Sequence, residues 1–358
     1  MHHLKFNEAE LKVVSEIPSM MPGAPPTPLY DFPVTRREAY IATMERKPIW
    51  QITNIETRFF TPRANPDNVA RAFVFEDTPM QPLEGPVKDM FGVEWVYVPV
   101  AGGSMVEPGN PLLKDANEWE EKLVWPDIDS WDWEASAKNI TMDKGVFNIV
   151  WIMNGWFERL ISFMDFENAV MALIDEDQQD AVKALFDRLS DLYIRLIDKH
   201  LEYLPDIDCF CFHDDWGAQK DTFFSPATAA EMIVPAMKKV TDHLHARGLY
   251  ADLHSCGMIE KQVPNIIAAG WDSWNPQPMN DTQKLYEMYG DKLILGVMPD
   301  PIAPDASEEE QRAAARAYVE KFCRPDKPSM LNFYASEFLT PAFREELYKQ
   351  SRIKYGGQ

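Results

Sequence analysis

Cysteine is scarce in this chain: four in 358 residues are too few for a disulfide scaffold, so we expect reduced thiols. Positive charge is also in short supply, because 35 Lys and Arg residues face 57 Asp and Glu residues, a net charge of −22 that repels phosphate backbones and anionic lipids. Apolar runs stay below the roughly 18 residues of a membrane-spanning helix, and the opening MHHLKFNEAELKVVSE lacks the basic-then-apolar pattern of a secretion signal. We therefore expect a soluble, cytoplasmic protein that binds neither nucleic acid nor membranes.

The composition, 46% hydrophobic and 26% charged, is that of an ordinary globular protein. Residues 1–35 contain the run MPGAPPTPLYDFP, whose prolines fix φ and remove backbone donors, so we predict an extended surface arm without regular elements. Residues 36–358 are predicted to form a single catalytic domain, with a Pro-, Gly- and Trp-rich insertion around residues 60–145. The arm is compatible with either a monomer or a homodimer.

Strand-like and helix-like segments alternate along most of the chain. Predicted strands cover residues 48–54, 93–100, 145–154, 208–215, 250–256, 272–277, 292–299 and 329–335. Predicted helices cover residues 34–47, 157–164, 177–204, 225–248, 259–270, 284–290, 307–322 and 340–356. Strands separated by helical crossovers form parallel sheets, and so many units favour an α/β fold of the (β/α)8 TIM-barrel type with an N-terminal extension.

Polar side chains end the predicted barrel strands, which is where barrel enzymes place their active sites. They are Asn54, Asn154, His213, Asp214, Asp215, His254, Cys256, Asn275, Gln277, Asp300, Asn332, Tyr334 and Glu337. The sequence has no Gly-x-Gly-x-x-Gly or Walker pattern after a strand, which weakens a nucleotide-binding alternative.

The most specific pattern is Leu-His-Ser-Cys-Gly at residues 253–257. Side chains alternate along a strand, so His254 and Cys256 lie on one side of it and can contact one ion. Imidazole and thiolate are ligands that zinc prefers, and a catalytic zinc needs a third protein ligand and an open position. The alternative is an ordinary buried His and Cys at a strand end.

The run from HDDWGAQKDTFF to GWDSWNPQ, residues 213–277, resembles the uroporphyrinogen decarboxylase superfamily, and within it the corrinoid-dependent methyltransferases with a His-x-Cys zinc motif. The resemblance is strong over residues 200–300 and weaker elsewhere. It implies a TIM barrel, zinc at His254 and Cys256, and a partner protein that carries the corrinoid (cobalamin).

The chain departs from this superfamily in two places. Porphyrinogen decarboxylases carry an Arg-rich run near the first strand, whereas PIWQITNIETRFF here offers only Arg58 to a polycarboxylate substrate, which disfavours porphyrinogen decarboxylation. The methyltransferases usually take a third zinc ligand from a Cys after the last strand, where this chain reads SMLNFYASEF. We expect Glu337 in that role, with Tyr334, Asp214 or Asp215 as alternatives, because carboxylate oxygen is an acceptable zinc ligand.

The remaining polar and aromatic strand ends are expected to serve the substrate. Asp214 and Asp215 are predicted acid–base residues, because adjacent carboxylates at a barrel mouth need a cation, solvent or a substrate donor. Substrate-contacting residues are predicted at Asn54, Asn154, Trp156, Trp216, Asn332 and Tyr334, where the aromatic members would wall a pocket for a flat ring. Cys209 and Cys211 are expected in the core, and Cys323 near the opposite barrel face.

These features lead to the hypothesis of a zinc-dependent methyltransferase. It would move a methyl group from a small methylated substrate, preferably an aromatic methyl ether, to the cobalt(I) of a corrinoid protein. One alternative runs in the other direction, from methylcorrinoid to a thiol. Another is a metal-free, decarboxylase-like lyase that uses the Asp pair, and a third is a catalytically silent scaffold.

Overall fold

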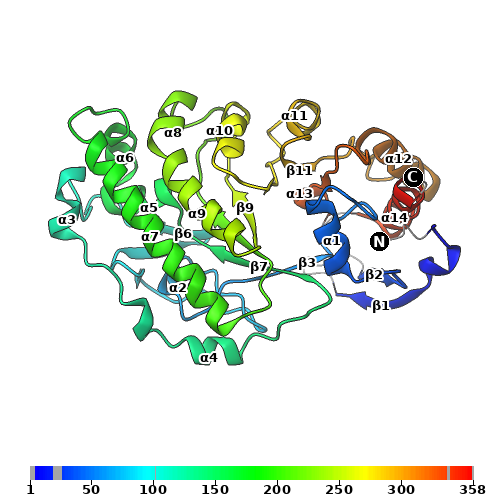
Figure 1. The fold of residues 1–358 in the computed structure, drawn as a ribbon, viewed down its shortest axis with the longest axis horizontal. Coiled ribbons are helices and arrows are strands. Elements are labelled where there is room, and N and C mark those ends of the chain that lie inside the picture. The colour runs from blue at the N-terminus through cyan, green and yellow to red at the C-terminus, as the bar shows by residue number, and fades with distance from the viewer. Residues whose placement is uncertain (1–4, 19–25, 101, 337–338, 357–358) are drawn as a thin grey trace. The chain divides into compact units, whose positions relative to one another are not determined.

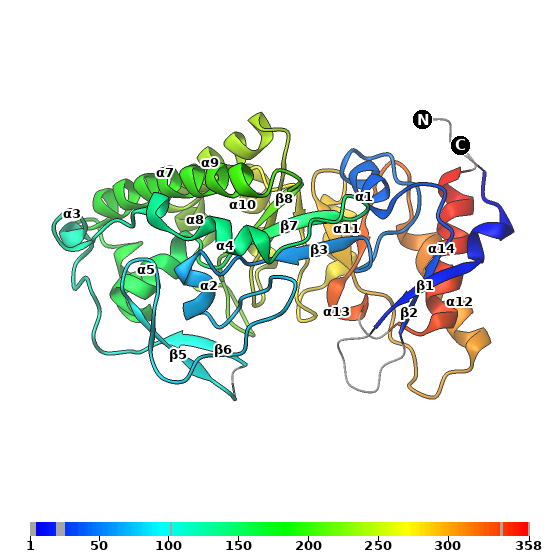
Figure 2. The same cartoon turned by 90° about the horizontal axis from the view of Figure 1, so that it is seen from below.

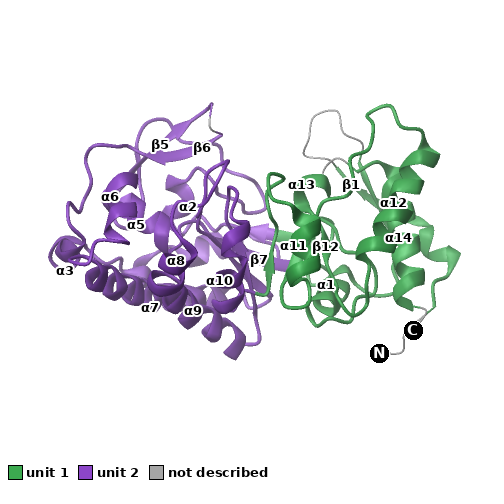
Figure 3. Cartoon of the chain, turned by 90° about the horizontal axis from the view of Figure 1, so that it is seen from above, with its two compact units in different colours: residues 1–58, 144–147, 272–358 green, residues 59–143, 148–271 purple. Residues whose placement is uncertain are grey.

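The computed structural model describes residues 5–18, 26–100, 102–336 and 339–356. The chain divides into two compact units, which are coloured separately in Figure 3. Unit 1 comprises residues 1–58, 144–147 and 272–358, and unit 2 comprises residues 59–143 and 148–271. Both units contain parallel strands that alternate with helices, so the predicted α/β, TIM-barrel-like fold is confirmed.

Unit 2 is built on three neighbouring parallel strands, β7 (Phe147–Ile152), β8 (Cys209–His213) and β9 (Tyr250–His254). The crossover from β7 to β8 contains α5 (Trp156–Met164), α6 (Phe166–Ala172) and the long α7 (Gln179–Tyr203). The crossover from β8 to β9 contains α8 (Pro226–Met232) and α9 (Val234–Ala246), and α10 (Val263–Ala268) follows β9. Helices α7 and α9 run side by side (Figures 1 and 2). These helices bury one apolar face each, as amphipathic crossover helices do.

Residues 59–143 of unit 2 form a different kind of structure. They contain α2 (Pro66–Ala70) and an antiparallel sheet of β4 (Val87–Lys88), β5 (Glu94–Val98) and β6 (Gly103–Val106). The short helices η2 (Ala116–Glu118), α3 (Trp119–Lys122), η3 (Ile128–Ser130) and α4 (Trp133–Lys138) follow. This stretch, called the inserted segment below, holds the strand predicted over residues 93–100 as β5.

Unit 1 repeats the parallel pattern with β10 (Ser273–Trp274), β11 (Ile294–Val297) and β12 (Met330–Leu331). Its helices are α1 (Arg36–Met44), α11 (Thr282–Tyr289), α12 (Glu308–Phe322), α13 (Phe333–Ser336) and α14 (Pro341–Gly356). Helix α1 begins with a capping box, in which Thr35 and Glu38 each bind the other's backbone N–H. Helices α12 and α14 pack against each other.

Several local predictions were wrong. The strand predicted over residues 329–335 ends at Leu331, because Asn332 Oδ1 accepts a hydrogen bond from the Tyr334 backbone N–H at 3.0 Å and the chain turns into α13. The described residues 48–54 contain no strand. The Glu56 carboxylate accepts hydrogen bonds from the Thr53 backbone N–H (2.7 Å) and from Trp50 Nε1 (2.9 Å), which folds the chain into a turn. Strand β3 (Thr57–Phe60) begins after this turn. The proline-rich arm holds η1 (Glu8–Leu11) and an antiparallel pair, β1 (Val13–Ile17) and β2 (Thr27–Tyr30).

The helix predicted over residues 225–248 is interrupted between α8 and α9. Pro235 lacks the backbone N–H that a continuous helix would use there, so the chain restarts at Val234 with proline in the first turn. Among the described residues, no helix is both long and apolar enough to cross a membrane.

Candidate metal centre

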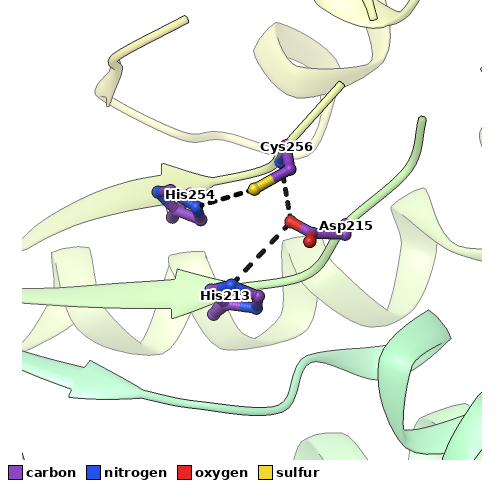
Figure 4. A group of neighbouring side chains, drawn as sticks. All are labelled: His213, Asp215, His254 and Cys256. Atoms are coloured by element: carbon purple, nitrogen blue, oxygen red, sulfur yellow. Dashed lines mark hydrogen bonds and ion pairs between the residues drawn. The ribbon is translucent and has the colours of Figure 1, made fainter. Parts of the chain in front are cut away.

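The ends of β8 and β9 bring together four side chains that can bind a metal ion (Figure 4). The two strands are parallel neighbours, and their register places His213 directly opposite His254. Asp215 follows β8 by two residues, and Cys256 follows β9 by two residues. Because side chains alternate along a strand, these i and i+2 pairs lie on the same side and face one another.

The four donor atoms lie within 4.8 Å of one another. His254 Nε2 is 3.4 Å from Cys256 Sγ, and His213 Nε2 is 3.9 Å from Asp215 Oδ1. A tetrahedral zinc ion with bonds of 2.0–2.3 Å holds its ligand atoms roughly 3.3–3.8 Å apart. The four residues match a zinc ion in chemical type, and the 3.4 Å between His254 Nε2 and Cys256 Sγ falls within this spacing. The backbone N–H of Cys256 donates to Asp215 Oδ1 at 2.6 Å and ties the two strand ends together.

The electrostatics of this group favour a neutral imidazole at His254 and a protonated thiol at Cys256. Burial, assisted by the nearby charge of His213, lowers the pKa of His254 to about 4. Burial, with the negative charge of Asp215, raises the pKa of the Cys256 thiol. Burial would also raise the pKa of Asp215, but the charge of His213, the neighbouring His254 and the hydrogen bond from the Cys256 backbone N–H outweigh it and lower that pKa. A dication at the centre would reverse the penalty on the thiolate, as coordinated thiols lose their proton.

His213 is held from its other side as well. Its Nδ1 lies 2.7 Å from Glu158 Oε2, on the first turn of α5, and Arg71 Nη1 lies 3.4 Å from the same oxygen. Burial alone would lower the pKa of His213, but the charges of Glu158 and Asp215 together raise it. A metal-binding imidazole is usually oriented in this way, by an acceptor at the nitrogen that does not bind the ion.

A sequence model of the uroporphyrinogen decarboxylase (URO-D) family matches residues 152–333, just over half of the chain, and this range includes all four donor residues. The chain belongs to the URO-D family. Among solved structures, it is similar to a methyltransferase from Methanosarcina mazei, with 13% sequence identity and a TM-score of 0.55 over 90% of this chain and 99% of that chain. At this identity the likeness shows the shared fold. No curated protein matches the sequence.

The predicted residues of unit 2 divide into two groups in this URO-D family member. His254, Cys256 and Asp215 meet at the centre described above. Asp214 is buried next to it, where its carboxylate accepts hydrogen bonds from the Glu158 backbone N–H and from Trp216 Nε1, both at 2.9 Å. Burial raises the pKa of Asp214 to about 7. Asp214 thus connects the end of β8 to the first turn of α5.

The other predicted residues of unit 2 are enclosed by protein. Trp156 and Trp216 have fully buried indoles, and Trp156 Nε1 donates to Ser190 Oγ at 2.9 Å. Asn154 is also buried and donates from Nδ2 to Asp67 Oδ2 at 3.0 Å. Cys209 and Cys211 are buried, as expected for core cysteines.

In unit 1, the predicted residues form hydrogen bonds with other residues of that unit. Asn332 is buried and donates from Nδ2 to the Pro276 and Gly296 carbonyl oxygens, whereas Tyr334 is half-buried. Asn54 Oδ1 accepts from Arg344 Nη1 at 3.3 Å. Cys323 is buried with its thiol 3.1 Å from Gln51 Oε1. Glu337 lies outside the described residues.

Sequence reasoning noted His213 as a polar strand end but did not place it with the metal ligands, and it missed Glu158 and Arg71. The sequence did contain a signal for His213. The segments that form β8 and β9 both end in His, and each carries a second possible ligand two residues later. The roles of Glu158 and Arg71 depend on how α5 and the inserted segment pack, which the local sequence pattern does not reveal.

A half-buried ring, that of Trp151, lies beside His254 and belongs to a group of aromatic side chains. Trp151 on β7 has its ring centroid 5.2 Å from that of His254, and Phe59 and Phe73 each lie 5.9 Å from Trp151. Phe75 extends the group, 4.8 Å from Phe73. We call Phe59, Phe73, Phe75 and Trp151 the aromatic cluster.

Gly257 determines the path of the chain directly after Cys256. Its φ is +88°, and an added Cβ would overlap the Gly217 carbonyl and lie 2.8 Å from the Ala218 carbonyl oxygen. Gly257→Ala is therefore expected to lower the free energy of unfolding by about 2–5 kcal/mol, measured by urea denaturation. Gly248→Ala is the matched control, because Gly248 has φ +74° but open space around it, and should cost only about 1–2 kcal/mol. Equal losses in the two variants would contradict the steric argument.

Proposed function

We propose that this URO-D family protein is a zinc-dependent methyltransferase, which moves a methyl group from a small methylated substrate to the cobalt(I) of a corrinoid carried by a partner protein. The observation that carries the proposal is the donor set His213, Asp215, His254 and Cys256 at the ends of two adjacent parallel strands. The methyltransferase name of the structural neighbour supports it. The resemblance of residues 213–277 to corrinoid-dependent enzymes supports the corrinoid partner.

The residues of this site would have different roles. His254 and Cys256 would hold the ion, with Asp215 and His213 completing the set from β8. When bound, a zinc ion supplies a Lewis acid that favours departure of the substrate oxygen. The acid–base role of Asp214 and Asp215 stays a prediction. In the structure, Asp214 orients α5 through the Glu158 backbone, and Asp215 contacts the Cys256 backbone.

An aromatic methyl ether is the substrate that we favour. In the aromatic cluster, Trp151 lies 5.2 Å from His254 and Phe73 lies 5.9 Å from Trp151, and flat rings pair with such side chains at centroid distances of 4.5–7 Å. An ether whose ring contacts Trp151 would bring its oxygen toward the donor set. The predicted substrate contacts at Asn54, Asn154, Trp156, Trp216, Asn332 and Tyr334 and the predicted ligand Glu337 stay predictions.

The test is a methyl-transfer assay with cob(I)alamin and three donors: 4-methoxyphenol, methoxycyclohexane and methanol. We expect methylcobalamin and an equal amount of hydroquinone from 4-methoxyphenol, with at least tenfold lower rates from the two non-aromatic donors. Trp151→Leu should raise KM for 4-methoxyphenol, whereas Phe166→Leu, at an exposed ring on α6, should leave it unchanged. The measurements are the visible spectrum of the corrinoid and chromatography of the phenol.

Two related assays have outcomes that would overturn the proposal. Methylation of a thiol by methylcobalamin, without activity on any ether, would reverse the direction of transfer. Release of carbon dioxide from a carboxylated substrate by zinc-free protein would indicate the lyase alternative.

A further inference from the structure

A chain of polar contacts leads from His213 into the inserted segment. It starts at His213 Nδ1, which is 2.7 Å from Glu158 Oε2, and continues to Arg71 Nη1, which lies 3.4 Å from that oxygen. The same Arg71 nitrogen lies 3.3 Å from Asn154 Oδ1, and the Asn154 amide donates to Asp67 Oδ2 at 3.0 Å. Two of these residues, Arg71 and Asp67, belong to the inserted segment.

Arg71 is itself held in place. It directly follows α2, and its guanidinium stacks over the ring of Trp95 on β5, with 4.9 Å from Cζ to the ring centroid. Aromatic stacking of this kind fixes a guanidinium plane while leaving its N–H groups free to donate. The inserted segment therefore places a fixed positive charge, the Arg71 guanidinium, next to Glu158. This charge holds the Glu158 carboxylate in its position against His213.

The hydrogen bond at Nδ1 determines what the other nitrogen of His213 can do. A neutral imidazole that donates Nδ1–H to a carboxylate has its lone pair on Nε2, the atom that faces Asp215 and the donor set. Without Glu158, the ring could rotate or take the other tautomer, and the lone pair would leave the centre. A carboxylate acceptor also makes Nε2 a stronger ligand.

We propose that Glu158 and Arg71 are positioning residues of the metal centre, which hold His213 in the orientation and tautomer that make its Nε2 a metal ligand. The proposal rests on the proposed function, because it assumes a metal at this donor set. It gives the inserted segment a role in coordination, although none of the four donor residues comes from it. The competing explanation is that the Arg71–Glu158–His213 contacts only stabilise the fold.

Metal binding distinguishes the two explanations without recourse to activity. Zinc affinity would be measured by chelator competition, and coordination by the visible absorption of the cobalt(II)-loaded protein. We expect Glu158→Ala and Arg71→Met to weaken zinc binding about 10–100-fold and to shift the cobalt spectrum toward that of His213→Ala. The thiolate-to-cobalt band from Cys256 should persist. Glu158→Gln keeps a neutral acceptor, and Arg71→Lys keeps the charge. The zinc affinity of each should lie between that of wild type and that of the two stronger variants.

The matched control is Arg352→Met. Arg352 forms a buried ion pair with Glu10 in unit 1, with Nε 2.9 Å from Glu10 Oε2, so its loss should lower stability and leave metal affinity and the spectrum unchanged. Wild-type affinity and spectrum in both Glu158→Ala and Arg71→Met, with lowered thermal stability, would overturn the positioning role and leave the proposed function intact.

A wild-type protein that binds neither zinc nor cobalt would instead overturn the proposed function. Separately, the His213 tautomer can be read by ¹H–¹⁵N NMR of the metal-free protein at alkaline pH. A proton on Nδ1 that Glu158→Ala removes supports the positioning role, and an unchanged tautomer in that variant overturns it.

Discussion

Replacing His254 by Ala or Cys256 by Ser is expected to abolish stoichiometric zinc binding. Purified wild type should hold about one zinc per chain, measured by elemental mass spectrometry, and each variant less than a tenth of that amount. The reason is geometric: the two donor atoms are 3.4 Å apart, the spacing of two ligands on one ion, so the loss of either leaves an incomplete set. Methyl transfer from an ether should fall to the level of a protein-free control.

Cys323→Ser is the matched control for this experiment. Its thiol is buried like a core side chain and contacts Gln51, so the variant should keep its zinc. Asp215→Asn and His213→Ala should each weaken affinity without abolishing it, and Glu337→Gln tests the ligand that was predicted from sequence. Full zinc content in both His254→Ala and Cys256→Ser would show that the metal binds elsewhere, and zinc-free wild type after metal supply would end the Lewis-acid mechanism.

The second large effect is expected at Arg159, which is fully buried in α5 between two carboxylates. Its Nη1 lies 2.6 Å from Asp89 Oδ2, its Nη2 contacts Asp67 Oδ2, and the ring of Phe91 covers the guanidinium. Burial opposes the charge, but the two carboxylates outweigh it and raise the pKa of Arg159. Arg159→Met leaves both carboxylates buried without a positively charged partner, so the free energy of unfolding should fall by about 3–5 kcal/mol in urea denaturation.

A rescue variant separates charge from packing in that experiment. Adding Asp67→Asn and Asp89→Asn to Arg159→Met removes the uncompensated charges and should recover at least half of the lost stability. If the triple variant is less stable than Arg159→Met, the loss comes from packing against Phe91 and Phe163 rather than from buried charge.

Most of the parallel strands and their crossover helices could be predicted from the sequence, because amphipathic periodicity and end signals agree locally. Helix α1 is an example, since Thr35 and Glu38 form the capping box within four residues of sequence. The predicted strand over residues 48–54 was wrong because a side chain, Glu56, captured the backbone N–H of Thr53. Propensity does not register such competition between side-chain and backbone hydrogen bonds.

In the candidate site, too, some residues could be predicted from local sequence and others could not. The pair His254 and Cys256 follows from strand alternation alone, which needs no knowledge of the neighbouring strand. His213 requires the register between β8 and β9, and Arg71 requires the packing of a segment more than 80 residues before Glu158 on α5. Contacts of long sequence separation are set by tertiary packing, so the sequence pattern does not display them.

The location of all four donors on β8 and β9 has a consequence for how the protein folds. These strands are consecutive in the chain, and a single crossover through α8 and α9 joins them, so the donor set closes with one β-α-β unit. Loop closure over so short a stretch costs less chain entropy than pairing distant strands. The four donor residues can therefore come together as soon as this one unit forms, without any contact between strands that are distant in the sequence.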